Sequence, residues 1–399
     1  MSSSMLVRGV AVTIALGLSG VMLFAQVGTV GGRTTAAPEI NASFANPQGR
    51  VLHTAVCGGV TQQGTPIAGN ASGGGTSGSI TISGVPGTAT VRRATLYWTV
   101  LTNADQTSPT GGSIMFDGNG IAGTKIGTQT GTPCFPQANT IAWKADVTAL
   151  VPSPGNGTYS VSGFPGGNAL GGNEFTEGVM LQILWTDPSA ALRDIAVYET
   201  PEGTGGLAVT NAIGDTFNQT LAFNINASGP VSGTLYEVIG NGQSAPELFS
   251  VSGPGGVVNL DNTLDGSTSE FAAGTCSYTD AADNTECYWD DDAPDFTGAL
   301  TNTTTSVMVN YKLTSDCHDF PANTVSVSTD AAGVCLTGGE FVDAQCPPDG
   351  TYKNHGDYVS CVAQAAEQFL ADLACGPSFP FEETQSCIVN PRARSDVGK

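Results

Sequence analysis

The stretch ATLYWTVLTN, residues 94–103, decides the fold class because apolar and polar side chains alternate along it. In an extended strand Leu96 and Trp98 would point to one face, and Tyr97 between them would point to the other. Such alternation is typical of antiparallel strands that bury one face. It recurs in VMLQILWT (179–186) and SVMVNYKL (306–313), with Gly-rich turns between the runs. The sequence therefore predicts an all-β fold of sandwiches rather than βαβ units.

Three pieces of the chain recur in the same order, which indicates an internal duplication. ATLYWTVLTN is echoed by GTLYEVIGNG (233–242), and SIMFDGNG (113–120) by LFSVSGPG (248–255). The third pair matches WKADVTALVPSPGNGTYSVSGF (143–164) with WDDDAPDFTGALTNTTTSVMVNY (289–311). In this alignment Asp295 corresponds to Asp146, so we expect its carboxylate to accept backbone N–H groups in a turn. We predict two tandem antiparallel β-sandwiches, over residues 51–203 and 204–332.

The strand ATLYW, the DG turn and the DVT-x-L…G-x-Y-x-V pattern resemble the jelly-roll sandwiches of secreted surface proteins, including galactose-binding-like domains. Tandem sandwiches of this kind occur in bacterial and archaeal cell-surface proteins of unknown function. The resemblance covers about residues 75–330. It implies jelly-roll domains, which often bind glycans and carry a structural Ca²⁺. No sugar-binding signature of that family is legible here, so no site residue is carried over.

Both ends of the chain differ from the β-rich middle. Arg8 precedes an apolar run, and we predict a signal peptide over residues 1–25 followed by a linker over 26–50. The alternative, a single membrane anchor, would need the run to span a bilayer near its minimum length. Residues 333–399 are predicted as a small Cys-rich helical tail. We expect its helix to be capped by Asp357, to end at Gly376-Pro377 and to bury one apolar face, formed by Val359, Val362, Ala366, Phe369 and Leu373.

Ten cysteines support export, because an even number without a C-x-x-C pair favours disulfides over zinc or redox motifs. We expect disulfides at Cys57, Cys134, Cys276, Cys287, Cys317, Cys335, Cys346, Cys361, Cys375 and Cys387. The pairings we expect are Cys57–Cys134, Cys276–Cys287 and Cys317–Cys335, with the last four cysteines stapling the tail.

The strongest candidate site is an acidic loop beside the expected Cys276–Cys287 disulfide. Its carboxylates are Asp280, Asp283, Glu286, Asp290, Asp291 and Asp292. Converging carboxylate oxygens suit Ca²⁺, which takes six to eight oxygen ligands in flexible geometry. No D-x-D-x-D-G loop is present, so a solvated acidic loop is the competing interpretation. Apart from Ca²⁺ no cofactor is expected.

Signals for catalysis are sparse. The chain has three histidines and neither a G-x-S-x-G nor an H-E-x-x-H motif. In SDCHDF (315–320) we expect an exposed histidine beside a disulfide, and His355 is expected in a turn at a helix start. Carboxylate pairs that would support glycoside hydrolysis are Glu174 with Glu177 and Glu199 with Glu202. Stacking on sugars is open to Trp98, Trp143, Trp185 and Trp289, although packing in the core is the default for all four.

The net charge of −22 argues against nucleic acid as a partner, because phosphates are bound by Lys and Arg. Three functions stay open. The first is a secreted, non-catalytic cell-surface or extracellular protein that acts in adhesion or structural assembly, with other surface proteins as partners. The second is a Ca²⁺-dependent carbohydrate-binding protein, and the third is a carbohydrate-active hydrolase. No stable membrane span is expected after signal cleavage.

Overall fold

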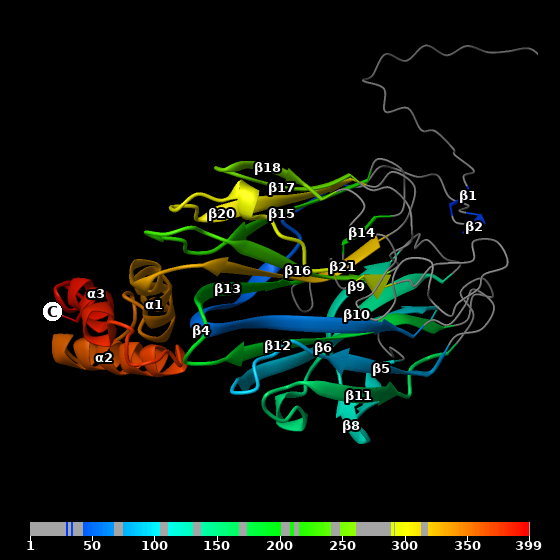
Figure 1. Ribbon diagram of the computed structural model, residues 1–399, viewed down its shortest axis with the longest axis horizontal. Coiled ribbons are helices and arrows are strands. Elements are labelled where there is room, and N and C mark those ends of the chain that lie inside the picture. Colours follow the sequence, from blue (N-terminus) through cyan, green and yellow to red (C-terminus); the bar gives the residue numbers. More distant parts are fainter. Residues whose placement is uncertain are drawn as a thin grey trace, which may run out of the picture.

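Strands carry the fold up to residue 328, and three helices follow them near the C-terminus (Figure 1). The computed structural model describes residues 29–30, 33–34, 43–67, 75–103, 111–130, 137–166, 174–200, 208–210, 215–240, 248–260, 289–290, 292–312 and 318–398. The prediction of a mostly β-sheet chain with a disulfide-bonded helical region at its C-terminus is confirmed. Strand β3 and the start of β4 lie inside the range predicted as a linker.

The largest sheet has ten strands in the order β19-β16-β21-β13-β4-β12-β6-β10-β9, with β14 beside β21. Their bounds are β4 Gly49–Pro66, β6 Thr90–Thr102, β9 Thr124–Thr130, β10 Asn139–Asp146, β12 Phe175–Thr186, β13 Leu192–Glu199, β14 Ala208–Thr210, β16 Gly233–Gly240, β19 Trp289–Asp290 and β21 His318–Ser328.

Two smaller sheets cover this central sheet on opposite sides, and Figure 1 shows the strands as stacked layers. One outer sheet has the order β5-β11-β7-β8, with bounds Ser77–Ile82, Gly157–Ser162, Ser113–Phe116 and Asn119–Ala122. The other has the order β18-β17-β20-β15-β3, with bounds Gly256–Asn259, Leu248–Gly253, Ser306–Lys312, Thr216–Ala222 and Ser43–Ala45. A separate pair joins β1 (Thr29–Val30) and β2 (Arg33–Thr34).

The long strand β4 divides the central sheet into two half-sheets. Residues 49–57 of β4 pair with β13, and residues 58–66 pair with β12. We call β4, β12, β6, β10 and β9 the first half-sheet, and β13, β21, β16 and β19 the second. The two half-sheets also contact each other face to face, since a hydrogen bond of 3.0 Å joins Thr324 on β21 to Gln182 on β12. We call this internal contact layer the seam.

The strand order on the two sides of the β13–β4 pair corresponds out to β19 and β10, with β9 and β14 unmatched, and two turns repeat the same hydrogen bonds. Asp146 accepts from the Thr148 N–H at 2.9 Å, and Asp295 accepts from the Thr297 N–H at 2.7 Å. The hydroxyl of Thr148 accepts from Ala94 N, and that of Thr297 accepts from Gly233 N, at 2.9 and 3.1 Å. Each turn leads into a short 3-10 helix, η1 (Thr148–Leu150) or η2 (Thr297–Ala299). The predicted turn role of Asp295 is confirmed.

The duplication does not extend to the tryptophans that begin the third repeated piece. Trp143 stacks on Trp98 with ring centroids 6.4 Å apart, in the core between the first half-sheet and the β5-β11-β7-β8 sheet. Trp289 instead packs in the seam with Tyr97, Met180 and Val238. Matching Trp289 with Trp143 was therefore wrong. Three extra residues between the tryptophan and Asp295 displace the second tryptophan along the chain, so its side chain reaches a different layer.

The three helices are α1 (Ala331–Gln345), α2 (His355–Asp372) and α3 (Phe381–Ala393), and they pack at one end of the strands (Figure 1). The predicted amphipathic helix is α2, which buries Val362, Ala366 and Phe369. Its N-cap is Asn354, whose side chain accepts from Asp357 N at 3.0 Å. The N-cap was expected at Asp357, which is one helical turn too late. Asn354 and Asp357 both have side chains that suit an N-cap, and only the backbone angles show which of the two holds that position.

Two of the expected disulfide pairings are wrong. Cys57 bonds Cys375, and Cys335 bonds Cys387, so both bridges involve the helical region. Cys346 bonds Cys361 within it. The expected pairings joined cysteines that are closer to each other in the sequence. For Cys57 this is wrong because β4 passes the end of α2, where Cys57 N donates to Leu373 O at 2.8 Å. The expected disulfide cysteines that lie outside the described residues are Cys134, Cys276, Cys287 and Cys317.

The predicted boundaries at residues 203 and 332 stay predictions. Strand β13 lies before the first boundary, yet it pairs with β21 after it as well as with β4. The β-structure on either side of residue 203 is therefore hydrogen-bonded into one continuous sheet.

We predict that Gly178→Ala destabilises the protein by about 1–3 kcal/mol, the usual range for overpacking a core. A Cβ at Gly178 would overlap the Trp289 indole, and one at Gly64 would lie 2.6 Å from its Nε1. Urea unfolding monitored by Trp fluorescence measures the loss. The matched control is Gly87→Ala, where a Cβ meets no atom within 4 Å. Equal stability of the two variants would contradict the close packing of Trp289 on these strands.

Candidate functional site

Most of the acidic loop predicted as a Ca²⁺ site lies outside the described residues, including Asp283, Glu286 and Asp291. Asp290 pairs through β19 with Ile239. Asp292 is partly buried, and its carbonyl oxygen accepts from Glu237 N at 3.3 Å and from Gln62 Nε2 at 3.2 Å. Among the residues that the structure describes, no three His, Cys, Asp or Glu side chains gather in a metal-binding group. The Ca²⁺ site stays a prediction.

His318, expected to be exposed, is buried at 1% exposure. Its Nδ1 is hydrogen-bonded to the Tyr311 hydroxyl, and burial lowers its pKa to about 3. The neighbouring Asp319 points to the opposite face of β21, into the seam. The expectation of exposure failed because both faces of β21 are covered, a property that the sequence of one strand does not reveal.

His355 begins α2, as expected for a residue at a helix start. Its Nδ1 lies 2.8 Å from Val397 O, and its Nε2 lies 2.9 Å from Ala393 O. Both ring nitrogens thus contact carbonyl oxygens at the end of α3 and beyond it. This histidine ties the last described residues of the chain to α2.

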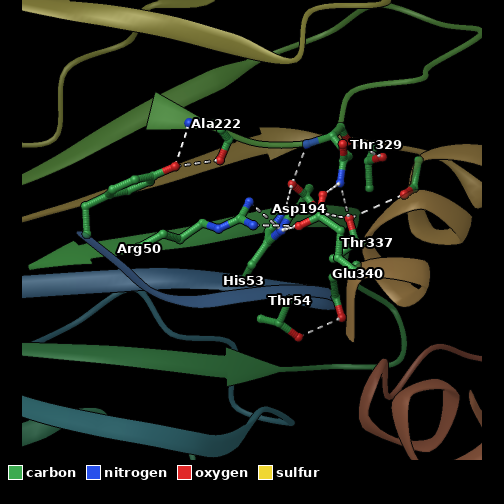
Figure 2. Close-up of polar contacts among 12 residues, drawn as sticks. Arg50, His53, Thr54, Asp194, Ala222, Thr329, Thr337 and Glu340 are labelled. Atoms are coloured by element: carbon green, nitrogen blue, oxygen red, sulfur yellow. Dashed lines mark hydrogen bonds and ion pairs between the residues drawn. The ribbon is translucent and has the colours of Figure 1, made fainter. Parts of the chain in front are cut away.

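The third histidine lies in a polar cluster where α1 meets β4 and β13, shown in Figure 2. We call this cluster the junction network. His53 Nε2 is 2.8 Å from Asp194 Oδ2, and His53 Nδ1 is 3.0 Å from Glu340 Oε2. Arg50 Nη2 also donates to Glu340 Oε2 at 2.6 Å. Two strands of the central sheet and one helix therefore meet through a single imidazole ring.

Asp194 is fully buried, and its carboxylate is surrounded by donors. Besides His53, it accepts from the Thr337 hydroxyl at 2.6 Å and from Asn224 N at 2.8 Å. Thr337 belongs to α1, and Asn224 follows β15 in the outer sheet. A buried carboxylate with three donors satisfies the requirement that buried charges be paired and hydrogen-bonded.

The two carboxylates stabilise the charged form of the imidazole. Burial alone would lower the pKa of His53, but the hydrogen bonds to Asp194 and Glu340 outweigh burial and raise this pKa to about 9. The hydrogen bond from His53 in turn lowers the pKa of Glu340 to about 2. A general base needs a free ring nitrogen within reach of substrate. Since both nitrogens of His53 bind carboxylates, the junction network acts as an ionic clamp rather than a proton acceptor for catalysis.

The seam between the half-sheets holds a second set of buried polar groups. Glu199 on β13 accepts from the Tyr97 hydroxyl at 2.7 Å and pairs with Lys144 Nζ. Amides continue the contact, because Gln182 donates to Gln62 at 2.9 Å within the first half-sheet, and Gln62 Nε2 donates to Glu237 O of the second half-sheet at 2.9 Å. These side chains sit at polar positions of alternating strands, which the sequence pattern assigns to a solvated face.

Glu177 and Asp319 form a carboxyl pair within the same seam, and both are 1% exposed. Glu177 lies in a β-bulge of β12, between Thr176 and Val179, where the pairing with β6 shifts register. Thr99 on β6 donates to Glu177 Oε2 at 2.7 Å. A hydrogen bond between the two carboxyls requires that one of them carry a proton, and burial raises the pKa of Asp319 to about 6.

Sequence reasoning paired Glu177 with Glu174 and Glu199 with Glu202, and the second pairing stays a prediction. Glu177 meets Asp319 rather than acting with Glu174, which contacts the Thr102 hydroxyl. Glu199 meets Tyr97 and Lys144, and Glu202 lies outside the described residues.

Three of the four tryptophans are buried, and Trp185 is partly buried with its Nε1 donating to Thr61 at 3.1 Å. The default of core packing is thus confirmed for Trp98, Trp143 and Trp289.

We predict that His53→Gln lowers stability by about 3 kcal/mol at pH 7, because it removes one partner of a buried ion pair. A raised histidine pKa contributes stability that is present below about pH 6.5 and lost as the pH rises through about 9. The wild type should therefore lose stability between pH 7 and 10, and His53→Gln should lose less over that interval. Urea unfolding at both pH values measures this. The matched control His355→Gln should keep the wild-type decline, and an equally steep decline in His53→Gln would contradict the clamp.

The sequence matches no protein-family model and no curated protein sequence. Of the helices in the described part of the chain, none has the length and apolar character needed to cross a membrane.

Proposed function

We propose that this is a secreted, non-catalytic extracellular protein that acts at the cell surface in adhesion or structural assembly. The observation that carries the proposal is the distribution of charge. Strands β5, β7, β8 and β11 of one outer sheet contain no charged residue, and those of the other contain only Lys312. In a chain of net charge −22, these two sheet faces are where another negatively charged surface meets least repulsion.

The outer faces also have the chemistry of contact surfaces. Thr81 and Thr158 are exposed on adjacent strands, with their hydroxyl oxygens 3.1 Å apart. On the opposite outer sheet Leu248, Val257 and Met308 are exposed. Strand β18 is the last in that sheet among the described residues, so its outer edge offers backbone groups for strand addition.

Two further features support the proposal. Three disulfides tie the helices to one another and to β4, as expected in an oxidising compartment. All three histidines of the chain serve structural contacts, which removes the usual general bases.

We also propose that the two halves are tandem jelly-roll-like sandwiches related by duplication. The support for this is the corresponding strand order and the matched turns at Asp146 and Asp295.

Sedimentation velocity of the mature, oxidised protein over a concentration series tests the proposal. We predict reversible association that Val257→Asp abolishes, because the substitution places a negative charge on the edge strand. The matched control Leu336→Asp changes an exposed apolar residue on α1 and should associate like the wild type. A monomer at every concentration that also fails to bind cells would overturn the proposal.

A glycan array read with Ca²⁺ and with EDTA distinguishes the alternatives. Glycan binding lost in EDTA would favour the Ca²⁺-dependent carbohydrate-binding protein and draw attention to the loop of Asp283 to Asp292. Release of reducing sugar from a bound polysaccharide would favour the hydrolase. Association without either result leaves adhesion or assembly as the function.

A further inference from the structure

The Glu177–Asp319 pair joins the two half-sheets, since Glu177 belongs to β12 and Asp319 to β21. Two local features bring the carboxyls together. The bulge at Glu177 turns that side chain toward the seam. Strand β16 is also irregular between Val238 and Gly240, and Gly240 faces Asp319 across the strand pair.

Gly240 is required by the space that the pair occupies. A Cβ at this position would overlap Asp319 Oδ1 and lie 2.5 Å from Glu177 Oε2. Both carboxyls thus pack against a bare backbone. The Thr99 hydroxyl donates to Glu177 Oε2, and the hydrogen bond from Glu177 to Asp319 opposes the burial that raises the pKa of Asp319. The second oxygen of Asp319 has no hydrogen-bond partner.

We propose that Glu177 and Asp319 act as a proton-dependent clasp between the two half-sheets. In acid Asp319 is protonated, and the hydrogen bond between the two carboxyls holds this end of the seam closed. At neutral pH Asp319 passes its proton to solvent and becomes a buried carboxylate, one oxygen of which has no hydrogen-bond partner. A buried charge with too few donors favours separation of the strands or entry of water.

Other titratable groups on the packed strands do not account for such a switch. Burial raises the pKa of Tyr97 and Tyr236 and lowers that of His318, so these three stay uncharged between pH 4 and 7. Glu199 and Lys144 neutralise each other as an ion pair. Glu237 on β16 is also buried, and burial raises its pKa as well. Variants at the pair itself separate its contribution from that of Glu237.

The direction of the effect follows from the raised pKa of Asp319, from 3.8 to about 6. Its contribution to stability is complete below about pH 4 and is lost as the pH rises through about 6. Each pKa unit corresponds to a tenfold change in equilibrium constant. Opening of this end of the seam should therefore become about 100-fold more frequent between pH 4 and 7.

Native-state hydrogen exchange in EDTA tests the clasp, with rates corrected for the intrinsic dependence of exchange on pH. Protection of the backbone amides of Leu181 and Asn323 should fall about 100-fold from pH 4 to 7 in the wild type. In Asp319→Asn the amide donates to Glu177 at every pH, so protection should stay constant. Glu177→Gln keeps the buried Asp319 and should retain the wild-type decline.

The matched control is Glu367→Gln, which removes one exposed carboxylate from α2 and should retain the wild-type pH dependence. Constant protection in the wild type would overturn the proposal. Equal pH dependence in the wild type and in Asp319→Asn would also overturn it and assign the titration to Glu237. None of these outcomes depends on whether the protein associates with itself.

Discussion

Pairing of β4 with β13 is the contact on which the rest of the structure depends. It joins the two half-sheets edge to edge through an antiparallel register from Cys57–Leu192 to Gly49–Glu199. Because β4 continues for nine residues beyond this register and pairs there with β12, the two halves share one hydrogen-bonded sheet. Rigid-body separation of the halves would break a full ladder of backbone hydrogen bonds, which buried backbone groups do not tolerate without new partners.

The same strand pair organises the helical region. His53 and Cys57 on β4 bind Glu340 on α1 and Cys375 after α2, and Asp194 on β13 binds Thr337 on α1. One covalent bond and one ionic network thus act within a few residues of each other. The ionic network orients α1 on the sheet, and the disulfide limits how far the chain after α2 separates from β4 when that network is weakened.

Charged side chains are buried in the seam, and Lys312 is the one charged residue in the described strands of the two outer sheets. Ionic and polar side chains concentrate between the half-sheets, where Glu199, Lys144 and Tyr97 satisfy one another. The outer faces are left with hydroxyl, amide and a few apolar groups. A layer of paired polar groups gives less stability than an apolar core of the same area, but its geometry is more specific. The Glu177–Asp319 pair, which shares a proton, adds a dependence on pH to that layer.

The sequence by itself determined the local features of this protein. Alternation at residues 94–103 and 306–313 predicted strands, the Asp146 and Asp295 turns were recognised as equivalent, and the 3.6-residue spacing around Val362 predicted a helix. Each of these depends on side chains within a few positions, so one segment contains enough information. Only the tertiary structure decided which strand face meets solvent, because the covering layer comes from distant segments. It therefore placed His318 in a core, paired Cys57 with Cys375, and brought Glu177 to Asp319 across the seam.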